Sequence, residues 1–416
     1  MKKIVLSIAG VMAAAAFAPE AAAIPAFARQ TGMACSACHQ QHYPVLNGFG
    51  QAFKAAGYTM MGAQEKVEGE HLSIPSSLNA ALLLKARYQK TNGVDPVGTI
   101  SGTTTNGGQW QIPDEFSLFF GGRVAENIGF MMENNTVGGP LGGIVAGFKM
   151  PVVFDMGGAK LSVIPFLTDA LGVAYGYDES STGMVRGIRW MEHRAEISAM
   201  QYVGNGAGAA SGLAFVGKND MGYINITKFA PDFAMAAGAT SPQLRSTFVR
   251  VAATPTVGDW AMHIGGAFTN GSSYTSGGVG GPLVLVDTKA TSLDFQAQGQ
   301  AAGKDLSIYA TWAKAPGNAV GALVFNQYNA AANDRKAWTI GADYSVIPHV
   351  LHLGAAYRSA DNGALINNKD NAFTVAAVYD LTQNVALHLN HSAYSGGART
   401  VAQGNALTTF MLESAF

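Results

Sequence analysis

The chain has 416 residues, enough for two or three ordinary domains or for one large β-barrel. Only 13% of the residues are charged, against about 25% in a typical soluble protein, whereas glycine contributes 51 residues and aromatic residues make up 10%. This composition favours a sheet with one face in lipid, and the formal net charge of −1 gives no indication of a nucleic-acid partner.

Residues 1–23 have the features of a secretory signal peptide. Lys2 and Lys3 come first, an apolar run follows over residues 4–18, and the alanines at 21–23 supply small residues for cleavage. The mature chain is therefore expected to begin near Ile24, outside the cytoplasm.

The most specific motif follows shortly after this signal. The chain has two cysteines, Cys35 and Cys38, and His39 comes directly after them. The spacing C-x-x-C-H is that of a covalent c-type haem site, in which each cysteine forms a thioether to the porphyrin and the histidine binds the iron. A zinc site would need a second Cys/His pair, and a redox dithiol would need a surrounding βαβ pattern; neither is present. We therefore expect one haem c, held by Cys35, Cys38 and His39.

The segment around the motif, residues 24–62, is expected to be a small haem-binding unit. Residues 24–29 are interpreted as an extended lead-in held by Pro25, with Phe27 packed on the porphyrin. A short helix carries the motif and breaks before Pro44. A second helix ends at Gly57 and presents apolar residues at helical spacing to the haem, namely Leu46, Phe49 and Phe53.

The distal haem ligand is less well defined by the sequence. Met60, with Met61 beside it, follows the second helix and is placed to offer a thioether, which would raise the reduction potential. His71 is the next candidate, and His42 is weaker because it lies on the same helical face as His39. In the alternative interpretation, Met60 and Met61 only pack against their surroundings, and the distal side of the haem is empty or occupied by water.

Three segments of this region carry a family resemblance: IPAFARQTGM at 24–33, PVLNGFG at 44–50 and FKAAGYT at 53–59. Over about residues 24–61 the chain resembles the fused outer-membrane cytochrome–porins of iron-oxidising bacteria. The resemblance implies a monohaem head that plugs a porin-like barrel and accepts electrons from extracellular Fe(II). The haem residues transfer as Cys35, Cys38 and His39, and no iron-binding residue transfers.

A polar connector, residues 63–77, leads to residues 78–416, which have the pattern of a transmembrane β-barrel. No apolar run of 18 or more residues follows the signal, and no helix is expected after residue 72. Instead, segments of about ten residues alternate in polarity. In 336–346, for example, Trp338 and Ile340 alternate with Thr339 and Asp343. The same period of two occurs in 258–268, 304–313 and 384–394.

Tight turns at 346–349 and 381–384 and longer polar tracts at 92–108, 270–281 and 316–334 fit the short periplasmic turns and extracellular loops of such a barrel. The last ten residues, 407–416, resemble the terminal recognition strand of bacterial outer-membrane proteins. The length predicts about 16 antiparallel strands. A secreted β-sandwich or solenoid would expose a very large apolar surface, so it is disfavoured.

Charged and histidine residues on the other face of these strands are expected to line the lumen. They are Glu115, Arg123, Arg194, Glu196, His263, Asp294, Asp343, His352, Arg358 and His388. Solvated lining explains each of them, so no catalytic residue is assigned.

The sequence thus predicts an outer-membrane electron-transfer protein that takes electrons from extracellular Fe(II) and passes them to a periplasmic carrier such as a cytochrome c. As an enzyme it would be a ferrous iron oxidase. The alternatives are electron export to an extracellular acceptor and a solute porin with a structural or sensory haem plug. No dinucleotide fingerprint, P-loop or HExxH motif is found.

Overall fold

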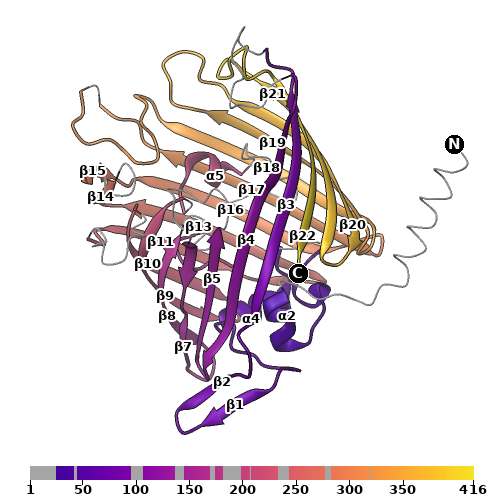
Figure 1. Ribbon diagram of the computed structural model, residues 1–416. Helices are drawn as coiled ribbons and strands as arrows, with labels where there is room; N and C mark the ends of the chain where they lie inside the picture. Colours follow the sequence, from indigo (N-terminus) through magenta and orange to yellow (C-terminus); the bar gives the residue numbers. More distant parts are fainter. Residues whose placement is uncertain are drawn as a thin grey trace, which may run out of the picture.

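The computed structural model describes residues 25–41, 45–94, 106–135, 145–168, 174–180, 198–206, 208–232, 243–276, 283–319 and 321–416. The described part of the chain starts with a small unit of three helices, which we call the head, residues 25–62. A two-stranded hairpin follows and projects beyond one end of the barrel (Figure 1). The elements are α2 (Pro25–Thr31), α3 (Cys35–Cys38), α4 (Gly48–Ala55), β1 (Lys66–Gly69) and β2 (Leu72–Pro75).

The rest of the chain forms a closed antiparallel barrel of 16 strands. Each strand pairs with its neighbour in sequence, and β22 closes the barrel on β3 through the register Leu407↔Thr91 to Ala415↔Leu83. The barrel segments are β3 (Ala80–Thr91), β4 (Gln109–Ala125), β5 (Ile128–Asn135), β6 (Val145–Lys149), β7 (Val152–Asp155), β8 (Lys160–Thr168), β9 (Ala210–Asn219), β10 (Gly222–Ala230), β11 (Ser246–Ala253), β12 (Thr256–Val257), β13 (Trp260–Asn270), β16 (Ala290–Ala301), β17 (Lys304–Ala315), β18 (Arg335–Ile347), β19 (Leu351–Asp361), β20 (Asn371–Thr382), β21 (Val385–Ser395) and β22 (Ala406–Ala415).

Two of the strands are each interrupted by a proline, which is why there are more segments than strands. Pro151 separates β6 from β7, which share the neighbours β5 and β8. Pro255 separates β11 from β12, which both pair with β13. Proline has no N–H to donate to a ladder, so each break falls where the ladder loses a hydrogen bond.

The strands alternate between lipid and lumen as the sequence predicted. On β18, Trp338 and Ile340 are 46% and 51% exposed on the outer face, whereas Thr339 and Asp343 are 6% and 1% exposed on the inner face. The outer apolar belt and the absence of an unpaired edge fit a barrel that lies in a membrane. In the described residues, no helix has the length and apolar character needed to cross a membrane.

The predicted strands and turns are confirmed, and several local expectations are wrong. The lead-in at Pro25 is helical in α2, because proline at the first helical position costs no hydrogen bond. A short helix, α5 (Ala199–Val203), lies after residue 72. Part of the loop at 270–281 forms a hairpin, β14 (Ser272–Ser276) with β15 (Leu283–Asp287), and part of the connector forms β1 and β2. The signal peptide lies outside the described residues.

The two ends of the barrel differ. Short turns follow β4, β9, β16, β18 and β20, and the long connections, such as 92–108 and 316–334, all lie at the other end. In bacterial outer-membrane barrels short turns face the periplasm and long loops face outward. We call the opening with the short turns the short-turn end, and the opening with the long connections the outward end.

Candidate functional site

The two cysteines lie on a single helical turn. Cys35 begins α3 and Cys38 ends it, and a spacing of three places them on the same face. Cys35 is buried, Cys38 is half-buried, and they form no disulfide. His39 leaves the helix in extended conformation and donates its backbone N–H to the Cys35 carbonyl at 3.0 Å. The two sulfur atoms and the imidazole are therefore carried by one rigid turn.

The orientation of the His39 ring is set by the next segment. Its Nδ1 lies 3.2 Å from the carbonyl oxygen of Val45, and an antiparallel bridge joins His39 to Leu46. A carbonyl can only accept, so Nδ1 carries the hydrogen and Nε2 carries the lone pair. This second contact fixes the tautomer that metal-binding histidines use. The residues of the motif therefore fit a c-type haem, with Nε2 of His39 as the axial donor.

The thiols are not arranged as a reactive dithiol. Burial raises the pKa of Cys35 to about 12, and burial also raises the pKa of Cys38. Redox-active CxxC pairs depend on a lowered thiol pKa, because the thiolate is the attacking species. Within the described residues, moreover, no group of three or more His, Cys, Asp or Glu side chains is placed to hold a metal ion.

The aromatic residues of the head pack on each other. Phe27 is stacked on Tyr58 at 5.0 Å between ring centroids, and Phe53 meets these two rings edge-on at 5.2 and 5.8 Å. Phe27 also faces the wall, where a Cβ on Gly121 would lie 3.0 Å from its ring. These contacts form a small apolar core that joins α2 to α4 and to the barrel. Leu46 was predicted to lie on the second helix, and this is wrong: it precedes α4 and forms a β-bridge with His39.

The candidates for the distal ligand are separated by the structure. Met60 is 37% exposed, and its carbonyl accepts a hydrogen bond from Gln30 at 2.7 Å, so its position is tied to α2. His71 lies at the tip of the hairpin between β1 and β2 with 94% of its side chain exposed, which counts against it. His42 lies outside the described residues. Met60 therefore stays the predicted ligand.

The head is docked in the lumen at the short-turn end. The backbone N–H of Cys35 donates to Gln383 in the turn after β20 at 3.0 Å. Gln41 donates to the carbonyls of Asp305 and Asp343, at 3.1 and 3.2 Å, and so reaches two neighbouring strands. On β13, two places from β17 in the barrel, Nε2 of His263 lies 3.1 Å from the side-chain oxygen of Gln51. The head is thus bound to several strands of the wall, and Figure 1 shows its helices α2 and α4 at this end of the barrel.

A second element enters the lumen from the outward end. The connection between β8 and β9 is long, and its described parts, 174–180 and 198–206, are almost completely buried; we call them the insert. Its helix α5 starts with a cap in which Ser198 accepts from the N–H of Met200, and it stops at Gly204, which has a φ of 92°. The N–H of Ala199 donates to Thr311 on β17 at 2.9 Å.

Buried charges connect the insert to the wall. Arg250 on β11 forms a two-pronged ion pair with Asp294 on β16, at 2.6 and 2.9 Å, and its Nε also donates to Asp178 of the insert at 3.1 Å. Its Nη2 donates to Ser180 at 2.8 Å. The insert also meets the head, because Nζ of Lys54 on α4 donates to the carbonyl of Asp178. The two elements thus touch inside the barrel.

The predicted lumen residues are found there, but they do not converge on one site. Asp294 belongs to the Arg250 network, His388 pairs with Glu413 at 3.0 Å, and Arg358 pairs with Asp370 at 3.1 Å. The remaining contacts follow in one set: Glu115 with Lys85, Arg123 with Ser73 and Thr59, His352 with Ser345 and Asp380, His263 with Gln51, and Asp343 with Gln41 through its carbonyl. Arg194 and Glu196 lie outside the described residues.

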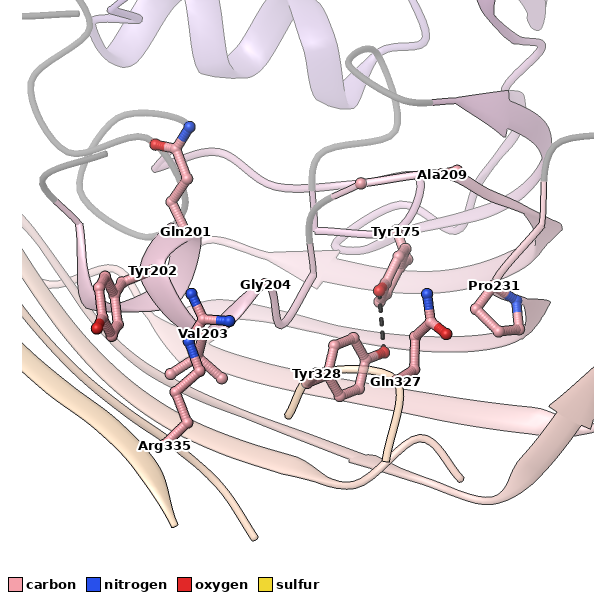
Figure 2. A pocket seen from close by; sticks show the side chains of 11 residues that line it. Tyr175, Gln201, Tyr202, Val203, Gly204, Ala209, Pro231, Gln327, Tyr328 and Arg335 are labelled. Carbon is pink, nitrogen blue, oxygen red and sulfur yellow. Dashed lines mark hydrogen bonds between the residues drawn. The ribbon is translucent and has the colours of Figure 1, made fainter. Parts of the chain in front are cut away.

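The insert, the wall and the loop before β18 also border an open-sided cavity of about 270 Å³, which we call the outward cavity. Its lining combines residues from the insert, the start of β18 and the preceding loop, and Figure 2 shows them around the opening. The residues used below are Tyr175, Gln201, Tyr202, Gln327, Tyr328 and Arg335. None of these was singled out from the sequence, since neither the insert nor Arg335 belongs to a motif.

Comparisons with known proteins support the fold. The sequence matches no protein-family model and no curated protein. Among solved structures, Pseudomonas putida OprB at high pH aligns with a TM-score of 0.51 and 9% identity, over 82% of this chain and 94% of that one. The outer membrane channel DcaP of Acinetobacter baumannii aligns with a TM-score of 0.49 and 10% identity, over 82% of this chain and 97% of that one. The outer-membrane protein OmpT of Vibrio cholerae aligns with a TM-score of 0.45 and 12% identity, over 85% of this chain and 100% of that one. The chain therefore has the fold of a porin-like β-barrel.

Proposed function

We propose that this protein transfers electrons across the outer membrane through one haem c covalently attached to the head, from extracellular Fe(II) to a periplasmic electron carrier. The observation that carries the proposal is the turn formed by Cys35, Cys38 and His39, with Nδ1 of His39 facing the Val45 carbonyl. Haem, when attached there, supplies a centre that gains and loses one electron.

The chain's own residues fix the position and surroundings of this centre. Cys35 and Cys38 supply the sulfur atoms for the thioethers, and Nε2 of His39 supplies the axial nitrogen. The bond from Cys35 N–H to Gln383 holds the motif near the short-turn end, where a soluble periplasmic carrier approaches. The apolar core of Phe27, Phe53 and Tyr58 excludes water from one side of the head, and a dry surround raises the reduction potential.

Spectroscopy of the purified holoprotein tests the proposal. Addition of Fe(II) should produce the reduced bands of a c-type haem, and His39→Ala should abolish this change. His349→Ala, in an exposed turn after β18, is the matched control and should leave it unchanged. A colourless polypeptide, or a strongly negative midpoint potential in a redox titration, would contradict electron uptake from Fe(II).

The second candidate is a solute porin in which the head is a plug or sensor. The outward cavity favours it, because a polar cavity in the lumen is a place for a solute. Liposome swelling separates the two functions. Swelling in sugar solutions supports the porin, and a barrel that stays sealed while it passes electrons supports electron transfer.

A further inference from the structure

We propose that the outward cavity is a binding site for a small organic carboxylate, held by Arg335. This site goes beyond the proposed electron transfer and does not depend on the haem, since its described lining comes from the insert, the barrel and the loop before β18, and not from the head. Its evidence is the charge, the hydrogen-bonding groups and the size of the cavity.

The first step concerns charge. Arg335 opens β18 and reaches the insert (Figure 2). Among the described residues no carboxylate lies within ion-pair distance of its guanidinium, and its buried Nε has no hydrogen-bond partner there. The adjacent Asp334 pairs instead with Lys314 at 2.6 Å, and the nearby Arg358 is paired with Asp370. Among the described residues that line the cavity none is acidic, and the one charged side chain, Arg335, is positive. A bound anion would supply the counter-charge and the hydrogen-bond acceptor that the Arg335 guanidinium lacks in the described part of the chain.

The second step concerns geometry. The Arg335 guanidinium lies 4.6 Å from the centre of the Tyr202 ring, and the Arg358 guanidinium lies 4.7 Å from the same centre. A guanidinium held on an aromatic ring presents its donors in a fixed plane, and a carboxylate accepts from such a fork with two oxygens. Arg335 is thus positioned before a ligand arrives.

The third step concerns the rest of the ligand. Gln201 and Gln327 supply amide groups, and the hydroxyls of Tyr175 and Tyr328 form a pair at 3.0 Å (Figure 2). Val203 and Pro231 add apolar surface. A volume of about 270 Å³ is near the lower end of the ~300–1,000 Å³ that holds drug-sized ligands. These features select a small acid with an apolar body rather than a bare inorganic anion or an oligosaccharide.

The location gives access from outside. The loop at 316–334, which supplies Gln327 and Tyr328, belongs to the outward end, and Arg335 follows it directly. The head lies toward the opposite opening. A ligand in the outward cavity therefore meets the insert before it meets the head.

Isothermal titration of the full-length holoprotein in detergent tests the site at constant ionic strength. Benzoate is the probe, benzamide is its neutral analogue of the same shape, and inorganic phosphate is the bare anion. Benzoate should bind saturably with one site. Benzamide and phosphate should each bind about tenfold more weakly or worse, because one lacks the charge and the other the apolar body. Equal binding of phosphate would overturn the carboxylate assignment.

Variants locate the site. Arg335→Gln should weaken benzoate binding about ten- to hundredfold, the effect of one charge-assisted hydrogen-bonded pair. Lys336→Gln removes the same charge from the next residue, whose side chain is exposed and does not line the cavity, and should leave the affinity unchanged. Equal losses in the two variants, or no saturable benzoate binding by the unaltered protein, would overturn the proposal. The latter result does not depend on any variant folding.

Discussion

Removing the Arg250 side chain should destabilise the barrel strongly, because its guanidinium neutralises two buried carboxylates. Arg250 is fully buried, and the side chains of Asp178 and Asp294 are each 1% exposed. Its Nε also donates to the hydroxyl of Tyr223 at 2.8 Å. The glycine at 265 on β13 leaves space for the ion pair, because a Cβ at this position would lie only 3.0 Å from both Arg250 Nη1 and Asp294 Oδ1.

The magnitude follows from what remains after the substitution. In Arg250→Met the two carboxylates lose their shared counter-charge in a space without room for bulk water. Breaking a buried ion pair on one side costs about 3–5 kcal/mol. That corresponds to about two to four powers of ten in the folding equilibrium constant. The double variant Arg250→Met with Asp294→Leu should recover about 0.5–3 kcal/mol of this loss, because only Asp178 then remains unpaired.

Equilibrium urea unfolding in lipid vesicles, followed by tryptophan fluorescence, measures these differences. Lys228→Met on the neighbouring strand β10 is the control, since Lys228 is exposed and its loss should change the free energy of unfolding by less than about 0.5 kcal/mol. A loss below about 1 kcal/mol in Arg250→Met would refute the reasoning, because it would mean that water reaches the carboxylates and replaces the guanidinium.

Three further predictions test the head and the wall. In denatured holoprotein, Ellman's reagent should find no reactive thiol, whereas a polypeptide without covalent haem would show two. Gly50→Ala should lower the haem content per polypeptide, measured by the pyridine haemochrome, because the added Cβ would lie 2.2 Å from the Cys38 carbonyl; Gly48→Ala adds a Cβ in open space and should not. Ile340→Arg should cost about 2–4 kcal/mol in the same unfolding assay if Ile340 lies near the midplane, whereas Lys336→Gln should be nearly neutral.

The barrel could be predicted from the sequence because its signal is local. Alternation of Trp338 and Ile340 with Thr339 and Asp343 fixes which face each residue takes, and the confirmed strands follow this period. The errors lie where two local rules compete. Pro25 is compatible with an extended segment and with the first position of a helix, and in the structure it is the first residue of α2. Helix α5 is only five residues long, too short for a helical period to be visible.

The partners of the lumen residues could not be predicted in the same way. Asp294 was expected to face inward, but its pairing with Arg250 depends on the register of β13 between their strands. Asp178 reaches the same guanidinium only because the insert folds into the lumen, and nothing in its local sequence indicates this. The outward cavity has the same origin: Tyr202 and Arg335 are far apart in the sequence and meet because the insert places α5 against β17 and β18.

The hydrogen bond from Lys54 to the Asp178 carbonyl joins the head to the insert, and both proposed functions depend on how firmly these two elements are held. The head is bound to the wall at the short-turn end through Gln41 and Gln51, and Arg250 binds the insert from the other side. Separation of the head from the insert or from the wall would break buried hydrogen bonds, each of which costs about 1–3 kcal/mol to leave unmade. Transfer of an electron requires no such separation. These contacts hold the head and the insert together inside the barrel. Lys54→Met removes one of them and should therefore raise the rate of liposome swelling in sugar solutions, while the visible spectrum of the proposed haem stays unchanged.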